Sequence, residues 1–468
     1  MRKIILPLFA ILALWQTSCK DKADVTKTAA VYITTLDKTS LLAKEELPIQ
    51  DATEASLENR ITIDTVITYQ TMDGFGYTLT GGSAQHIHQM SDEARANLLQ
   101  ELFGTDTISI GVSYLRVSIG ASDLDEAPFS YDDLKEGETD KELTHFSLAH
   151  DTIDVVPVLK EILSIVPNIK ILGSPWSPPI WMKDNKDTRG GSLLPEYYDS
   201  YAQYFVKYIQ AMEKEGIPID AVTIQNEPLH PGNNPSLLML PEQQAEFIKN
   251  HLGPAFKENQ LKTKIIIYDH NADRPDYPIT ILDDKDAAQY IDGSAFHLYG
   301  GKIQALSKVH EAHPDKHLYF TEQWVGAPGN FANEMSWHTE NLIIGAPRNW
   351  SKNVLEWNLA ADEHQDPHTD RGGCDRCLGA VTITGDKVTR EPAYYIIAQA
   401  SKFVRPGAIR VASNLPEAVP NVAYKNTDGS YVAIVQNTSK EEKSISVVLH
   451  NKEVAISLKE GAIGTLVW

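Results

Sequence analysis

The chain has 468 residues, of which 42% are hydrophobic and 22% are charged, a composition that indicates a folded protein and excludes extensive disorder beyond the N-terminus. There are 42 Lys and Arg residues against 63 Asp and Glu residues, so the net charge is −21. Because no cluster of Lys or Arg offsets this charge, we expect no nucleic-acid partner and no binding to anionic membrane surfaces, and a neutral ligand fits better.

The first 19 residues have the pattern of an export signal. Two basic residues precede an apolar run over residues 4–15, which is too short to cross a bilayer as a helix. Cys19 follows small residues, as in bacterial lipoprotein signals, where this cysteine is acylated and becomes the new N-terminus. We therefore expect residues 20–29 to form a tether and the protein to be lipid-anchored to a bacterial outer membrane, on its periplasmic face or at the cell surface. Secretion without a lipid is the alternative.

Both ends of the remaining chain predict β-strands. Polar and apolar residues alternate over 30–36, 41–47 and 60–69, and again over 431–436, 443–449, 453–458 and 461–468. We expect segments 30–70 and 385–468 to pair into one β-sandwich.

Between these ends, strand-like and helix-like stretches alternate, which is typical of a parallel α/β barrel. Eight strands are predicted, over residues 74–78, 114–119, 170–173, 221–225, 264–268, 294–298, 318–321 and 353–357. Helices are predicted over 92–103, 195–215 and 241–257, among others. The fold class is therefore α/β, a (β/α)8 TIM barrel over residues 71–384 with an attached β-sandwich built from both chain ends.

The predicted barrel strands end in polar or aromatic residues that a sealed core would not select. They are Tyr77, Arg116, Trp176, Asn226, Glu227, Asp269, His270, His297, Tyr299, Glu322 and Trp357, with Leu298 between His297 and Tyr299. In this fold the C-terminal strand ends surround the active site, so these side chains are expected to share one mouth.

Two of them, Glu227 and Glu322, are candidates for a pair of catalytic carboxylates. Glu227 follows the fourth predicted strand and Glu322 ends the seventh, three strands further around the predicted circle of eight, so their carboxylates face each other across the mouth. Paired carboxylates cleave glycosidic bonds, and a separation of about 5 Å makes the reaction retaining, with Glu322 as nucleophile and Glu227 as acid and then base. That division needs a raised pKa at Glu227 and an ionised Glu322, held by donors such as Arg116 or Tyr299.

Other residues near the mouth suit a sugar ligand. Asn226 and Asp123 can bond hydroxyl groups, and Trp176, Trp324 and Trp357 can stack on sugar rings. For Arg116 a buried structural ion pair is an alternative that can hold together with a binding role. Trp181 lies in the same proline-rich loop as Trp176, and one of these two is expected to be packing.

His364, His368, Cys374 and Cys377 have a spacing that superficially suggests zinc. In an exported protein, two nearby cysteines more often form a disulfide. A Cys374–Cys377 bridge is the first hypothesis, and free thiols or zinc are the alternatives.

Seven stretches of the chain carry a family resemblance. They are Met72–Gly76, Leu115–Asp123, Ser174–Trp181, Gln225–Pro228, Phe296–Tyr299, Thr321–Glu322 and Glu356–Ala360. From about residue 30 to the C-terminus, the chain resembles glycoside hydrolase family 30, which includes glucosylceramidases, β-1,6-glucanases and some xylan-degrading enzymes. The resemblance implies a retaining mechanism with Glu227 as acid/base and Glu322 as nucleophile. It implies a sugar-binding subsite of Arg116, Asp123, Trp176, Asn226, His297, Tyr299 and Trp357.

Some stretches depart from the glucosylceramidase pattern. Phe75-Gly76-Tyr77 stands where that pattern has Gly-Gly-Ala, and the Gly372–Cys377 loop and the Ser401–Gly407 stretch look more like the bacterial β-1,6-glucanase branch. The resemblance thus implies an endo-β-1,6-glucanase acting on a β-linked glucan without cofactor or metal. An exo-acting β-glucosidase of glucosylceramidase type, a β-xylosidase, and a non-catalytic glycan-binding surface lipoprotein are the alternatives.

Overall fold

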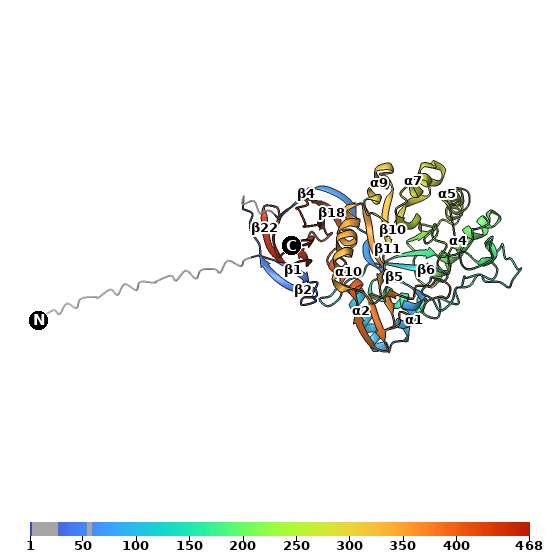
Figure 1. Cartoon of the computed structure of the whole chain (residues 1–468), viewed down its shortest axis with the longest axis horizontal. Helices are drawn as coiled ribbons and strands as arrows, with labels where there is room; N and C mark the ends of the chain where they lie inside the picture. Colours follow the sequence, from blue (N-terminus) through green and yellow to red (C-terminus); the bar gives the residue numbers. More distant parts are fainter. Residues whose placement is uncertain (2–26, 54–58) are drawn as a thin grey trace.

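The computed structural model describes residue 1, residues 27–53 and residues 59–468. The predicted signal, Cys19 and most of the predicted tether lie outside these residues. Figure 1 shows two parts, a barrel surrounded by helices and a smaller β-rich part that holds the C-terminus.

Eight parallel strands close into the barrel, and each corresponds to a predicted strand. They are β5 (Gly74–Leu79), β6 (Tyr114–Ile119), β7 (Lys170–Pro175), β8 (Ala221–Thr223), β9 (Lys264–Ala272), β10 (Ile291–Gly301), β11 (His317–Glu322) and β13 (Ser351–Asn358). Their residues are almost continuously buried, because helices cover the outside and side chains fill the inside. The predicted barrel is confirmed.

Helices surround the barrel. They are α1 (Gly81–Gln89), α2 (Asp92–Phe103), α3 (Val155–Ile165), α4 (Tyr198–Lys214), α5 (Pro241–Phe247), α6 (Gly253–Glu258), α7 (Asp276–Asp283), α8 (Lys285–Ala288), α9 (Ala305–Ala312), α10 (Phe331–His338), α11 (Gly345–Arg348) and α12 (Pro392–Ser401). The Ser91 hydroxyl caps α2 by accepting from the Ala94 amide. The predicted helix over 241–257 is α5 joined to α6 by a π-helical turn. Within the described residues, no helix combines the length and the apolar character that a membrane span requires.

One apolar layer fills the inside of the barrel. Seven of its strands contribute one residue each, namely Tyr114, Leu172, Ala221, Ile266, Ala295, Tyr319 and Leu355. This layer closes the barrel below the C-terminal strand ends. The polar residues that follow on the same strands therefore lie above an apolar floor.

The second part is a ten-stranded sheet with the order β2-β1-β23-β20-β19-β18-β4-β21-β22-β3. Its strands are β1 (Thr28–Thr34), β2 (Ala43–Pro48), β3 (Gln50–Asp51), β4 (Arg60–Thr71), β18 (Ile409–Ser413), β19 (Asn421–Lys425), β20 (Tyr431–Gln436), β21 (Lys443–Leu449), β22 (Lys452–Leu458) and β23 (Ile463–Val467). β1 pairs with β23, and β4 pairs with β18 and β21. The sheet folds over one core that contains Val31 of β1 and Ile456 of β22. A sandwich built from both chain ends is confirmed.

The segment between the two parts belongs mainly to the barrel side. β16 (Val381–Thr384) and β17 (Lys387–Arg390) form a hairpin, and α12 contacts β5 and β13 of the barrel. The predicted division at residue 384 falls within this hairpin. The C-terminal strands of the large sheet begin at β18, after the hairpin and α12.

Candidate active site

A cavity of about 840 Å³ opens at the C-terminal ends of the barrel strands. Eight of the predicted site residues line it, namely Asp123, Trp176, Asn226, Glu227, Tyr299, Glu322, Trp324 and Trp357. The cavity falls within the range of roughly 300–1,000 Å³ that holds ligands of drug size. The other two, Arg116 and His297, are fully buried and do not line it. That these two contact a sugar stays a prediction. In this structure they contact the lining residues Glu322, Asn226 and Glu227.

The two glutamates meet in this cavity. A carboxylate oxygen of Glu227 and one of Glu322 lie within 4.8 Å of each other and of a His297 ring nitrogen. Glu227 has a positive φ of 46°, a strained conformation for a residue other than glycine. Its backbone N–H donates to the Asp269 carbonyl at 3.0 Å, which fixes the turn after β8. The separation suits direct attack and protonation on one sugar ring.

Glu322 is held by two donors. Arg116 Nη1 donates to Glu322 Oε2 at 2.6 Å, and the Tyr299 hydroxyl donates to Glu322 Oε1 at 2.9 Å. Arg116 Nη2 also donates to the Asn226 amide oxygen at 2.7 Å, which orients the amide of this cavity-lining residue. Arg116 is thus a buried ion-pair partner that orients two residues of the site.

Asp269, near the end of β9, is a central residue that was expected at the mouth but was assigned no catalytic or sugar-binding role. It accepts from Arg116 Nη2 at 2.8 Å, and its other oxygen lies 3.1 Å from His297 Nε2. Thr223 and Thr321 donate to it as well. Burial alone would raise the Asp269 pKa, but Arg116 and His297 hold that pKa well below its usual range. Its place near a barrel strand end was the available signal, but sequence could not show that it contacts both Arg116 and His297.

Burial lowers the pKa of His297, but Glu322, Asp269 and Glu227 outweigh burial and raise that pKa to about 9. The ring therefore carries a positive charge at neutral pH. Its Nδ1 lies 3.5 Å from Glu227 Oε1 and 3.7 Å from Glu322 Oε1. The positive charge of His297 thus stabilises the ionised forms of both carboxylates.

The pKa values of the two glutamates are ordered differently from the sequence-based expectation. Burial raises the pKa of Glu227, but His297 outweighs burial and the pKa is lowered. Burial and the charge of Glu227 raise the pKa of Glu322 against the opposing effects of His297 and Arg116. The expected raised pKa at Glu227 is therefore wrong for the free site. Because like charges this close disfavour double ionisation, the pair tends to keep one proton between them.

Several polar atoms at the cavity are buried without a hydrogen-bond partner among the described residues. Asp123 Oδ1 and Trp176 Nε1 are two of them. Burial, together with Glu322 and Glu227, raises the pKa of Asp123 to about 8. Buried polar atoms without partners are costly, so this wall is suited to a ligand that carries hydroxyl groups.

Trp176 and Trp357 line the cavity, whereas Trp181 packs in the protein interior. Trp176 and Trp357 lie 5.3 Å apart between ring centroids, above the Arg116 guanidinium. Trp181 is buried and packs edge-on against Tyr197, and its indole N–H donates to Asp132. Trp181 is therefore the packing member of its loop.

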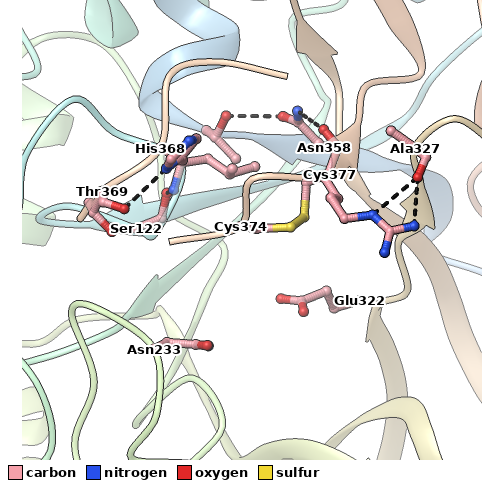
Figure 2. Close-up of a disulfide and its surroundings, with 12 residues drawn as sticks. Ser122, Asn233, Glu322, Ala327, Asn358, His368, Thr369, Cys374 and Cys377 are labelled. Atoms are coloured by element: carbon pink, nitrogen blue, oxygen red, sulfur yellow. Dashed lines mark hydrogen bonds between the residues drawn. A yellow bond between two sulfur atoms is a disulfide. The ribbon is translucent and has the colours of Figure 1, made fainter. Parts of the chain in front are cut away.

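Cys374 and Cys377 are joined by a disulfide that borders the cavity (Figure 2). The bridge occupies both sulfur atoms that a zinc site would need. Among the described residues, no potential metal-binding group combines these cysteines with His364 and His368. The histidine and cysteine spacing therefore does not form a zinc site in this structure.

Comparison with known proteins agrees with this geometry. The family model of the glycosyl hydrolase family 30 TIM-barrel domain matches residues 72–404, and that of the family's beta sandwich domain matches residues 407–466. Endo-1,6-beta-D-glucanase neg1 of Aspergillus fumigatus is 33% identical, over 96% of this chain and 95% of its own. Lysosomal acid glucosylceramidase of Mus musculus is 29% identical, over 83% of this chain and 79% of its own.

Among solved structures, the endo-beta1,6-glucanase BT3312 superposes with a TM-score of 0.87 at 36% identity, covering 94% of this chain and 99% of that one. The barrel and the sandwich agree with these matches. The chain belongs to glycosyl hydrolase family 30 and is a retaining glycoside hydrolase.

Proposed function

We propose that this hydrolase is an endo-β-1,6-glucanase. One observation carries the proposal: three relatives that are 33–34% identical are named endo-1,6-beta-D-glucanases, whereas five relatives named glucosylceramidases are 27–30% identical. The solved β-1,6-glucanase that matches over nearly its full length supports the same substrate. The partner is then a neutral β-linked glucan.

The reaction proceeds by double displacement at one sugar ring. Glu322 attacks the anomeric carbon while Glu227 gives a proton to the departing oxygen, and the bond between that carbon and oxygen breaks. Glu227 then takes a proton from water, which attacks the glycosyl-enzyme ester and releases Glu322. Both residues line the same cavity, and Arg116 and Tyr299 hold the attacking carboxylate in place.

The first step requires the shared proton on Glu227 and the charge on Glu322. Positive charge that develops at the anomeric carbon beside Glu322 favours its ionised form, and Arg116 favours that form too. The His297 ring lies at similar distances from both carboxylates, so its positive charge stabilises the ionised form of either one. We infer that substrate binding moves the proton to Glu227.

The mechanism predicts that Glu227→Gln and Glu322→Gln each lower kcat on pustulan, a β-1,6-glucan, by about 10³-fold or more, because each removes an essential group. Reducing-sugar release measures the rate. Glu334→Gln is the matched control, since Glu334 is a third glutamate at the same cavity and has no place in the two steps. Wild-type-like turnover in either catalytic variant would refute the assignment.

The products distinguish the proposed activity from its alternatives. An endo-β-1,6-glucanase releases a ladder of oligosaccharides from pustulan and leaves β-1,3- and β-1,4-glucans intact. Release of glucose alone from chain ends would instead indicate an exo-β-glucosidase, and activity confined to xylosides a β-xylosidase. Binding of pustulan without any cleavage would favour a non-catalytic glycan-binding protein.

We also propose that the protein is exported and anchored through a lipid on Cys19 to the outer membrane of a bacterium. The basic and apolar pattern of residues 2–15, followed by Cys19, supports this location. Labelling with a radioactive fatty acid should mark the wild type and not Cys19→Ala, and the variant should leave the membrane fraction. An unlabelled wild type would indicate simple secretion.

A further inference from the structure

The Cys374–Cys377 bridge lies within the wall of the cavity. Cys377 packs in a cluster with Leu124, Trp176 and Trp357, and Cys374 and Trp324 pack against that cluster. Both cysteines and Trp324 also line the cavity. The bridge is therefore in contact with the aromatic surface that a sugar chain would meet.

The bridged loop is fastened to the segment that follows Glu322. β15 (Cys377–Leu378) pairs with β12 (Val325–Gly326), and Cys377 stands opposite Gly326. The Arg376 guanidinium donates to the Ala327 carbonyl at 2.8 Å (Figure 2). The Ala327 N–H donates to the Arg376 carbonyl, also at 2.8 Å. Any shift of the bridged loop is thus transmitted to residues 325–327.

Gly326 in turn supports the Trp324 ring. A Cβ atom placed on Gly326 would lie 3.1–3.4 Å from three atoms of that ring, closer than ordinary van der Waals contact allows. The indole therefore lies directly over the glycine. This leaves Trp324 partly exposed at the cavity, with its position set by the β12–β15 pair.

We propose that the Cys374–Cys377 bridge positions Trp324 as a stacking platform for a second glucosyl unit of the glucan, next to the unit held between the glutamates. This inference rests on the proposed function. Indole rings stack on the apolar faces of sugars, and a constrained loop lowers the entropy cost of presenting them. The bridge thus promotes binding of the polymer and takes no part in bond cleavage.

Two substrates separate these effects. Pustulan needs several glucosyl units bound at once, whereas β-glucosyl fluoride fills only the site between the glutamates and loses fluoride. For the Cys374→Ser/Cys377→Ser double variant we expect KM for pustulan to rise about tenfold, with kcat on both substrates within twofold of wild type. Equal loss of kcat on both substrates would overturn the proposal, because it would place the role of the bridge at the catalytic centre.

Gly326→Val provides a second variant that keeps the bridge. Its side chain would displace the Trp324 ring, so KM for pustulan should rise by a similar factor. If Gly326→Val and Trp324→Ala both raise KM while the double cysteine variant does not, the bridge is not what positions the ring. Unchanged KM in all three would also overturn the proposal.

Combining the changes tests whether they act through one residue. The double cysteine variant made in the Trp324→Ala background should raise KM no further than Trp324→Ala alone, because neighbours in one pathway are not additive. A full additional tenfold rise would show that the bridge acts elsewhere. If the wild type cleaves a β-glucan of another linkage, the proposed β-1,6 function fails, and the same comparison is made on that glucan.

Discussion

At the scale of single residues, the site consists of a charged network beneath two cavity-lining carboxylates. Arg116 and His297 supply positive charge, and Asp269 contacts both of them. The net effect is that two glutamates can share a buried cavity without both losing their charge. A lone carboxylate pair at this depth would be held neutral by desolvation.

The His297 charge should appear in the pH dependence of stability. Its folded pKa, about 9, lies above the usual value of about 6.5, so the stabilisation is fully present below pH 6.5 and is lost as pH rises through 9. We expect the wild type to lose on the order of 3 kcal/mol of unfolding free energy from this group between pH 6 and pH 9.5. Urea unfolding at both pH values measures it.

The His297→Gln variant should lack this part of the pH dependence. Asp123 titrates in the same range, with a pKa raised to about 8, so the comparison needs a variant at that residue. Asp123→Asn should keep the His297 contribution and lose only its own. A His297→Gln variant with the same pH slope as wild type would show that the ring is uncharged in the folded protein.

At the scale of elements, the strands bring their end residues together only because neighbouring strands approach closely. Gly76 of β5 stands opposite Tyr114 of β6 in the parallel register. A Cβ at Gly76 would overlap the Tyr114 backbone carbonyl oxygen. Glycine is required here by close approach of the two backbones.

Gly76→Ala should therefore destabilise the barrel by at least about 3 kcal/mol, because the overlapping atom is backbone and cannot rotate away. Denaturant unfolding followed by tryptophan fluorescence measures the change. Gly300→Ala is the matched control, since the nearest atoms to its added Cβ lie 3.4 Å away on the Asp273 side chain. If both variants unfold at the same denaturant concentration, the close approach of β5 and β6 is not limiting.

At the scale of the whole molecule, the barrel and the sandwich are joined by buried polar contacts at α12. The Gln399 side chain donates to the Thr34 hydroxyl at 2.6 Å and accepts from the Thr465 hydroxyl at 2.8 Å. Thr34 lies on β1 and Thr465 on β23, so one barrel-side residue binds strands from both chain ends. Folding of the sandwich is therefore linked to the presence of the barrel.

Gln399→Met keeps most of the length of the side chain and removes these bonds. We expect a loss of about 1–3 kcal/mol of unfolding free energy, because buried hydroxyl groups lose a partner, with kcat on pustulan unchanged. Unfolding and activity are measured on the same preparation. A fall in kcat without loss of stability would contradict this interpretation, since Gln399 lies outside the cavity lining.

Local pattern alone determined much of this protein. The alternation of strand-like and helix-like stretches predicted every barrel strand, and strand ends rich in polar residues located Glu227 and Glu322, since both signals depend on near neighbours in the chain. The pairing of the two chain ends also followed from their shared alternation.

Only the tertiary structure decided how the site works. It placed Arg116 and His297 beneath the cavity, brought Asp269 between them and reversed the expected order of the glutamate pKa values. It also connected the Cys374–Cys377 bridge to Trp324 through Gly326. These features depend on burial and on charges from strands far apart in sequence. The distances between such residues cannot be derived from a local sequence pattern.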